Sequence, residues 1–243
     1  MIEENWEART ELLIGANNIE KLHNSSVLVA GLGGVGAYAA ENICRAGVGK
    51  MTIVDGDKVT PANRNRQLLA LKSTEGLRKA EIMGKRLLDI NPSLQLTVID
   101  DFIRDEKIQR LMSEKYDYVV DAIDTLSPKL FFIIEALKTK VRLVSSMGAG
   151  GKTNPGLVKI SDIDDSYGCR LAYFIRKRLH KQGIRTGFKV VFSPEPVKKD
   201  AILHISHEQN KNSTVGTISY MPAIFGCFCA SVVIRDIAAT DGD

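Results

Sequence analysis

Residues 27–36 read Val27-Leu28-Val29-Ala30-Gly31-Leu32-Gly33-Gly34-Val35-Gly36, and Asp55 ends the next apolar run. The order is strand, glycine turn, helix, strand and acid, which is typical of a nucleotide-binding unit. Gly31 permits the tight turn, Gly33 lets the backbone approach a phosphate, and Gly36 lets the helix lie close to the strand. The helix N-terminus offers free N–H groups to anionic oxygens, and Asp55 is placed to bind ribose hydroxyls. The segment therefore predicts a nucleotide site.

The bulk composition is that of a soluble globular protein. The chain has 243 residues, of which 44% are hydrophobic and 26% are charged, enough for a sizeable core. The net charge of +4 is compatible with an RNA partner but does not require one. The N-terminus, Met1-Ile2-Glu3-Glu4-Asn5, has neither the basic nor the apolar region of a signal peptide. We therefore expect a cytoplasmic protein.

The four cysteines, Cys44, Cys169, Cys227 and Cys229, form no C-x-x-C pair, which argues against a structural zinc. Cys44, Cys227 and Cys229 lie in apolar helical segments and are expected in the core. Cys169 precedes a basic helix, where an incidental thiol is favoured over a reactive one. The cysteines therefore give no positive indication of a catalytic thiol.

One stretch challenges the expectation of a soluble protein. Residues 214–234 carry no charge and are long enough to span a bilayer. Gly216, Thr217, Ser219, Pro222 and Gly226 dilute its apolar content, which favours a buried helix of a parallel α/β domain over a membrane span.

Strands and helices alternate along the first 150 residues. A short helix is expected to end at Gly15. Strands are then predicted at 26–30, 51–54, 94–99, 118–122 and 142–146, and helices at 34–46, 74–90, 106–113 and 127–138. Crossovers of this length predict an α/β fold with a doubly wound, mainly parallel sheet, similar to the Rossmann fold.

The regular alternation of strands and helices ends after the glycine-rich segment 148–151. A strand is predicted at 157–163, a basic helix at 171–181, another strand at 189–193 and an apolar helix at 219–237. We expect a single domain over 1–243. It comprises an arm (1–24), a nucleotide-binding core (25–150) and a C-terminal α+β extension for substrate binding and dimerisation (151–243).

The loop after Asp55 favours a triphosphate over a dinucleotide. Attack at an α-phosphorus needs cations for the charge that develops, and Arg66 and Lys79 are placed to supply them. Asp124, near the end of the fourth strand, falls at the same sheet edge and is a candidate magnesium ligand. The alternatives are that Arg66 and Lys79 are solvated surface charges, and that Asp121 or Asp124 caps the following helix.

Taken together, these motifs resemble the E1-like adenylating family, which includes the ubiquitin-activating and ThiF/MoeB enzymes. The residues that carry the resemblance are Gly31-x-Gly33-Gly34-x-Gly36, Asp55-x-Asp57, Asn63-x-x-Arg66-Gln67, Lys79 and Asp121-x-x-Asp124. The resemblance implies that ATP activates a carboxylate as an acyl-adenylate and releases pyrophosphate.

Within that family the chain is more similar to the branch of tRNA threonylcarbamoyladenosine dehydratases than to the zinc-containing, sulfur-carrier-activating branch. The further segments that carry this likeness are 9–15, 63–67, 89–92, 120–124, 145–149, 176–179 and 191–193. The branch implies a tRNA substrate with threonylcarbamoyladenosine beside the anticodon, an adenylate of the threonyl carboxylate, and ring closure to cyclic threonylcarbamoyladenosine. A sulfur-transfer partner protein is a further possibility.

The family resemblance implies a role for each matching position. The residues implied in nucleotide binding are Gly31, Gly33, Gly34, Gly36, Asp55, Asp57, Asn63 and Gln67. The residues implied in catalysis are Arg66, Lys79, Asp124 as the Mg2+ ligand, and Arg9, which enters the ATP site of the neighbouring subunit of a homodimer.

A dense basic cluster lies in the second half of the chain. Its members are Arg170, Arg176, Lys177, Arg178, His180, Lys181, Arg185 and Lys189. Phosphate binding by RNA and a solvated helix face are both open interpretations.

Three other functions stay open. They are adenylation of the C-terminus of a ubiquitin-like sulfur carrier, an NAD-dependent oxidoreductase, and a catalytically silent binding module, against which the intact Arg66, Lys79 and Asp124 count.

Overall fold

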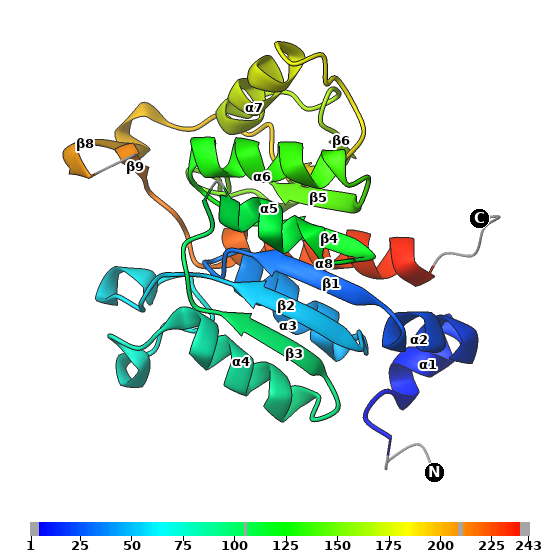
Figure 1. Ribbon diagram of the computed structural model, residues 1–243. Coiled ribbons are helices and arrows are strands. Elements are labelled where there is room, and N and C mark those ends of the chain that lie inside the picture. The colour runs from blue at the N-terminus through cyan, green and yellow to red at the C-terminus, as the bar shows by residue number, and fades with distance from the viewer. Residues whose placement is uncertain (1–4, 105, 209–210, 239–243) are drawn as a thin grey trace.

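The computed structural model describes residues 5–104, 106–208 and 211–238, and its centre is a seven-stranded sheet (Figure 1). The strand order is β3-β2-β1-β4-β5-β7-β6. The parallel strands are β1 (Ser26–Ala30), β2 (Lys50–Val54), β3 (Gln95–Ile99), β4 (Tyr118–Asp121), β5 (Arg142–Ser146) and β7 (Lys189–Phe192). The edge strand β6 (Lys159–Asp162) is antiparallel to β7. The predicted α/β class with a mainly parallel, doubly wound sheet is confirmed.

The strand order reverses between β1 and β4, since the chain runs outward to β3 and then returns to the other side of β1. In register, Val27 lies between Met51 of β2 and Tyr118 of β4. The carboxyl ends of these two central strands form the switch point at which ligands bind in open α/β sheets. The glycine turn follows β1 at this edge.

Helices cover both faces of the sheet (Figure 1). One face carries α3 (Gly36–Arg45), α4 (Lys79–Ile90) and α8 (Tyr220–Ala238), and the other carries α5 (Glu106–Ser113), α6 (Leu126–Lys138) and α7 (Arg170–His180). Two short helices, α1 (Ala8–Ile14) and α2 (Ala16–His23), precede β1. In the described connections, single-turn 3-10 helices lie at Pro61–Asn63, Lys72–Thr74, Pro155–Leu157 and Lys199–Ala201.

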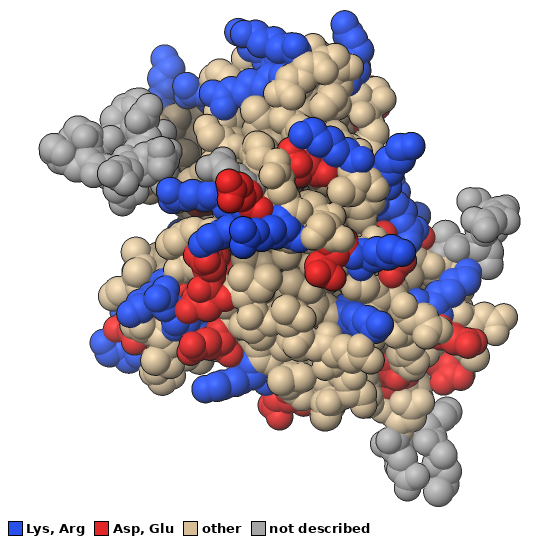
Figure 2. All heavy atoms as spheres, viewed as in Figure 1, with Lys and Arg blue, Asp and Glu red and all other residues tan. Residues whose placement is uncertain are grey.

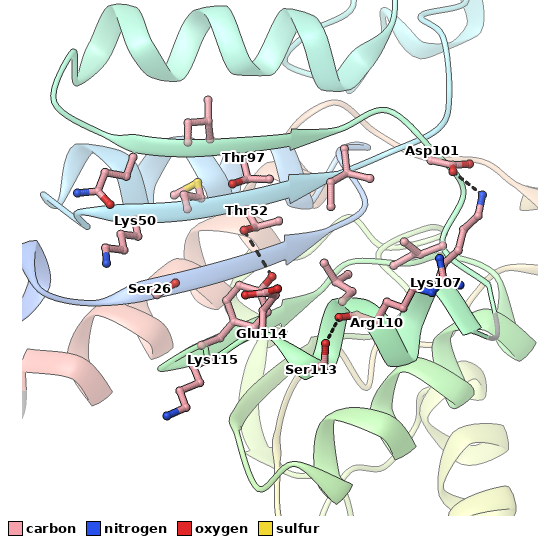
Figure 3. A pocket seen from close by; sticks show the side chains of 17 residues that line it. Ser26, Lys50, Thr52, Thr97, Asp101, Lys107, Arg110, Ser113, Glu114 and Lys115 are labelled. Carbon is pink, nitrogen blue, oxygen red and sulfur yellow. Dashed lines mark hydrogen bonds and ion pairs between the residues drawn. The ribbon is translucent and has the colours of Figure 1, made fainter.

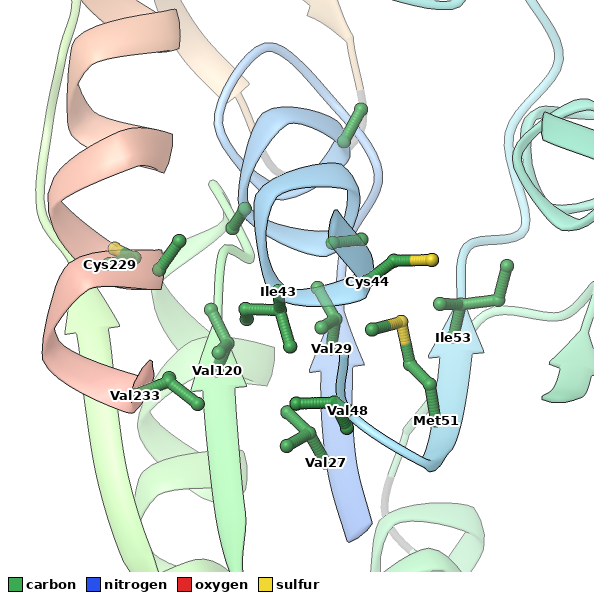
Figure 4. Close-up of a cluster of buried hydrophobic side chains, with 14 of the residues drawn as sticks. Val27, Val29, Ile43, Cys44, Val48, Met51, Ile53, Val120, Cys229 and Val233 are labelled. Carbon is green, nitrogen blue, oxygen red and sulfur yellow. The ribbon is translucent and has the colours of Figure 1, made fainter. Parts of the chain in front are cut away.

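The two faces of β1 enter different hydrophobic cores, because successive strand residues point to opposite faces. Val27 and Val29 pack under α3 and α8 with Ile43 (Figure 4). Leu28 and Ala30 pack under α5 and α6. All five side chains are fully buried. This arrangement holds the C-terminal ends of β1 and β4 in place at the switch point.

The uncharged segment at 214–234 forms most of α8, which is long and apolar enough to cross a membrane. Its buried residues, which include Met221, Phe225 and Val233, pack against α3 and the sheet, as expected of a core helix. The expectation that both Cys227 and Cys229 are buried is wrong. Cys229 lies in the core and Cys227 is exposed, because residues two apart on a helix point in nearly opposite directions.

Other departures from the predicted elements are local. Helix α4 begins at Lys79 rather than at 74, because residues 59–78 form an irregular segment in which Gly76 has φ of +82°. The prediction missed α2 and a second, two-stranded sheet, formed by β8 (Ile202–Glu208) and β9 (Lys211–Val215). In Figure 1 this hairpin projects from the body of the molecule.

Candidate functional site

The glycine turn is tightly packed at two of its positions. Gly31 has φ of +88°, and a Cβ there would lie 2.8 Å from the carbonyl oxygen of Ala122. A Cβ on Gly36 would lie 1.7 Å from the carbonyl oxygen of Gly31. Only glycine allows this close approach of the first turn of α3 to the ends of β1 and β4.

Open space lies beside Gly33. An added Cβ would meet only the Nε2 atom of Gln67, at 3.9 Å. The Oε1 atom of the same Gln67 side chain is buried, and among the described residues it has no hydrogen-bond partner. The atom nearest the space is the Nε2 donor, so the space fits a ligand that accepts hydrogen bonds. Gly34, in contrast, packs against Pro222 of α8.

Asp55 supports the glycine turn. Its Oδ2 accepts a hydrogen bond from the Leu32 N–H at 2.6 Å, and its Oδ1 accepts one from the Asp57 N–H at 2.8 Å. Burial raises the pKa of Asp55, and the Lys79 ammonium and these two N–H donors oppose that rise. The carboxylate therefore links the end of β2 to the turn after β1.

Lys79 is the first residue of α4, not one turn inside a helix as the sequence predicts. Its side chain is buried, and Nζ lies 2.9 Å from Oδ2 of Asp57, whose side chain is half exposed. The backbone reinforces the pair, because the Lys79 N–H donates to the Asp57 carbonyl at 3.0 Å. The ammonium is therefore held at the carboxyl ends of the parallel strands, where the glycine turn also lies.

The loop at 60–67 is braced by its own side chains. Asn63 Oδ1 accepts a hydrogen bond from the Thr60 N–H at 3.1 Å. The Arg66 guanidinium donates to the Ala62 carbonyl and to Asn65 Oδ1, at 2.9 and 2.8 Å. A Cβ on Gly34 would lie 3.4 Å from the Arg66 carbonyl oxygen, so this loop lies directly beside the glycine turn.

Asp121 neither caps a helix nor faces solvent. Its Oδ2 lies 2.7 Å from Nζ of Lys129 in α6, both side chains are fully buried, and Ser145 Oγ donates to the same oxygen at 2.6 Å. Lys129 Nζ also donates to the Ile123 carbonyl at 3.1 Å. This network anchors the loop that carries Asp124, which is exposed three residues after β4.

Sequence reasoning missed Lys129, although a signal for it was present. Lys129, Phe132, Ile133 and Ala136 share one helical face, and all four are buried. A lysine on the apolar face of a helix needs a carboxylate partner in the core.

Helix α1, which carries Arg9, lies near the amino-terminal ends of the parallel strands, whereas the glycine turn lies at their carboxyl ends (Figure 1). It is exposed on α1, next to Glu7, which is bonded to His23 just before β1 and lies beside Gly47 just before β2. One chain therefore does not bring Arg9 to its own glycine turn.

A groove of about 1080 Å³ lies between α5 and the β2–β3 face of the sheet (Figure 3). Lys107 is paired with Asp101 at one end, and Tyr116 donates to Thr52 at 3.5 Å. No residue predicted for the nucleotide site lines this groove. It is separate from the glycine turn.

Comparison with known proteins covers nearly the whole chain. The tRNA threonylcarbamoyladenosine dehydratase of Bacillus subtilis is 36% identical over 237 residues, which are 95% of this chain and 93% of that protein. The crystal structure of E. coli tRNA N6-threonylcarbamoyladenosine dehydratase in complex with ATP has a TM-score of 0.86 at 32% identity, over 98% of this chain and 96% of that one. The molybdopterin-synthase adenylyltransferase of Escherichia coli is 35% identical over 126 residues, which are 52% of this chain and 50% of that protein. The ThiF family model matches residues 8–242, and the chain belongs to the ThiF family.

Proposed function

We propose that this protein is an ATP-dependent tRNA threonylcarbamoyladenosine dehydratase. The likeness to dehydratases over almost the full length of both chains is the observation that carries the proposal. The likeness to an adenylyltransferase of molybdopterin synthase spans about half of the chain, which favours the dehydratase.

ATP fits the space at the glycine turn. Gly33 leaves room for a phosphate, the N-terminus of the ten-residue α3 favours an anion, and the Gln67 amide lies beside that room. Asp55 would bind the ribose while its other lone pairs hold the turn. Lys79 would exchange its contact with Asp57 for the phosphates, since the Asp57 carboxylate can return to solvent. Asn63 and Arg66 would line the triphosphate.

Mg2+ fits the carboxylates that lie near the glycine turn, at the carboxyl ends of the parallel strands. Magnesium binds through one or two carboxylates together with substrate phosphates, so a cluster of protein ligands is not needed. Asp124 would hold the ion, with Asp57 as a second candidate. The ion would neutralise charge on the phosphate oxygens during adenylate formation.

The proposed reaction has two steps on one substrate. The threonyl carboxylate attacks the α-phosphorus and releases pyrophosphate, and Lys79 and Arg66 stabilise the added negative charge. The ureido group of the same modified adenosine then attacks the acyl carbon and displaces AMP, which closes the ring. A tethered nucleophile has a high effective molarity, so no cysteine thioester is required.

Assembly is part of the proposal. A homodimer would allow Arg9 to act in the ATP site of the other copy, and the position of α1 away from its own glycine turn supports this. We also propose that the chain acts as a single domain, because strands from both the core and the C-terminal part enter one sheet. The likeness to tRNA-modifying enzymes supports a cytoplasmic location.

Mass analysis of tRNA nucleosides tests the proposal. Incubation with ATP, Mg2+ and tRNA that carries threonylcarbamoyladenosine should convert that nucleoside to its cyclic form, with AMP and pyrophosphate formed in equal amounts. Lys79→Ala should lower the rate by about 10²- to 10³-fold through lost transition-state stabilisation. Lys85→Ala, on the exposed side of α4, is the matched control and should keep the full rate.

Pyrophosphate release with a ubiquitin-like carrier, but not with the tRNA, would replace the proposed substrate with a protein. Binding of a nicotinamide cofactor without pyrophosphate release would refute adenylation itself. Normal turnover by Lys79→Ala would remove that residue from the mechanism.

A further inference from the structure

The solvent-facing side of α7 carries both basic and aromatic residues. Ala172, Ile175 and Leu179 form its buried side. The exposed residues recur at helical spacing along the other side, and they are Arg170, Tyr173, Lys177, Arg178 and Lys181. In Figure 2, Lys and Arg gather at the top of the molecule, where Figure 1 places α7.

Two exposed tyrosines are each paired with a cation. The Tyr173 side chain is 48% exposed, and Lys177 Nζ lies 6.0 Å from the centre of its ring. Tyr167 is 52% exposed, and Lys159 Nζ lies 5.1 Å from its ring centre and 2.6 Å from its hydroxyl oxygen. Each tyrosine therefore presents an exposed aromatic ring next to a positive charge.

Packing against neighbouring rings orients both tyrosines. Tyr167 meets Phe192 edge to face at 5.7 Å, and Tyr173 meets Phe174 edge to face at 5.5 Å. Arg170 lies over the Phe174 ring at 5.6 Å. We call the set Lys159, Tyr167, Arg170, Tyr173 and Lys177 the aromatic–basic surface.

The positive charges on this side fall into two groups. Arg176 donates to the carbonyl and hydroxyl oxygens of Ser166 at 2.5 and 2.6 Å, His180 contacts Asp164, and Lys189 contacts Asp236. Within the described part of the chain, Arg170 and Lys177 have no carboxylate partner. The charge of the aromatic–basic surface is therefore available to an anionic partner.

The aromatic–basic surface lies at the carboxyl ends of the parallel strands, where the glycine turn also lies. Lys159 pairs in register with Phe192, the last residue of β7, and Gly168 packs on Pro194 just beyond it. Helix α7 begins two residues after Gly168, so Arg170 and Tyr173 also lie near this edge. A ligand that extends from the glycine turn along this edge would reach both tyrosines.

We propose that the aromatic–basic surface binds unpaired nucleotides of the RNA substrate by stacking bases on Tyr167 and Tyr173. This inference rests on the proposed tRNA function. Every base offers a π-face, and the adjoining cations would contact the phosphates between stacked bases, which is how proteins hold single-stranded RNA. The surface would fix the loop that surrounds the modified adenosine.

Binding of two RNA probes tests this proposal. One probe is a hairpin with the unpaired loop of a substrate anticodon arm, and the other is the same strand annealed into a full duplex. Tyr173→Leu should weaken hairpin binding about tenfold, because a stacked base is lost, and leave duplex binding unchanged. Tyr173→Phe keeps the ring and should bind the hairpin within about twofold of the unmodified protein. Tyr167→Leu should resemble Tyr173→Leu.

Charge is tested separately by salt dependence. Lys177→Gln should reduce the slope of log affinity against log salt by about 0.7 to 0.9, because one phosphate contact is lost. Lys115→Gln removes the same charge from an exposed site before β4, at the opposite sheet edge, and should leave the slope unchanged. Arg176 is unsuitable for this test, because its contacts with Ser166 support the loop before α7.

Hairpin binding that is unchanged by Tyr173→Leu and Tyr167→Leu, or equally weakened for the duplex, would overturn the stacking proposal. So would failure of the unmodified protein to bind the hairpin. If the tyrosine variants bind weakly as expected but the unmodified protein forms no cyclic nucleoside, the proposed reaction fails and the RNA surface stands. If the reaction occurs and the variants bind normally, only the surface is refuted.

Discussion

At the scale of single residues, two glycines of one turn have different tasks. A Cβ on Gly36 would lie 1.7 Å from the Gly31 carbonyl oxygen, so Gly36→Ala has to separate α3 from β1. We expect it to destabilise the protein by more than about 4 kcal/mol. A Cβ on Gly33 meets no atom closer than 3.9 Å, so Gly33→Ala should change the free energy of unfolding by less than about 1 kcal/mol.

ATP affinity should also distinguish Gly33 from Gly36. The methyl group of Gly33→Ala would occupy the space proposed for a phosphate, so ATP affinity should fall at least about tenfold in a protein that remains folded. Urea unfolding and calorimetric titration with ATP measure the two effects. Unchanged ATP affinity in Gly33→Ala would place the phosphates elsewhere.

At the scale of an element, α6 is tied to β4 by a fully buried ion pair. Lys129→Met would leave the Asp121 carboxylate buried without its cation, which should cost about 3–5 kcal/mol of stability. Lys138→Met on the same helix is the matched control. It removes a mostly exposed cation, although its partner Glu135 is largely buried, so it should cost clearly less than Lys129→Met.

A second substitution identifies the cause. Asp121→Asn added to Lys129→Met removes the unpaired charge and keeps an acceptor for Ser145, so it should restore part of the lost stability. Urea unfolding of the unmodified protein, Lys129→Met, Asp121→Asn and the double variant measures the coupling. Equal destabilisation by Lys129→Met and Lys138→Met would contradict a structural role for the buried pair.

At the scale of the whole molecule, the position of Arg9 predicts a site shared between two copies. Arg9→Ala and Lys79→Ala should each lower AMP formation by about 10²-fold or more, because each removes a different group from the site. After subunit exchange in an equal mixture, half of the dimers are mixed and each has one intact site. About a quarter of the unmodified activity should therefore return.

Mixing is informative only if subunits exchange, which differently tagged copies of the two variants would report. Co-purified mixed dimers without activity would argue that Arg9 does not act across the interface. An active Arg9→Ala homodimer would remove that residue from the proposed mechanism.

Much of the core followed from the sequence because its signals are local. The strands at 26–30 and 142–146 and the helix at 106–113 have the bounds expected of them. The turn between β1 and α3 needs glycine for reasons that act within a few residues. The predicted start of helix α4, at residue 74, is wrong. Residues 59–78 are held by contacts with each other, such as the Val59–Leu77 hydrogen bond, and helical periodicity in the sequence does not predict such contacts.

By itself, the sequence determined the sheet class, the strand that leads to the glycine turn and the polar residues that follow it, because strand and helix periods and glycine conformations act over short separations. Only the tertiary structure decided that Asp121 is bound to Lys129, that Cys227 faces solvent, and that Arg9 lies away from its own glycine turn. These outcomes depend on how helices pack on the two faces of the sheet. That packing brings together side chains that are far apart in the sequence, and sequence separation alone does not predict which of them will be in contact.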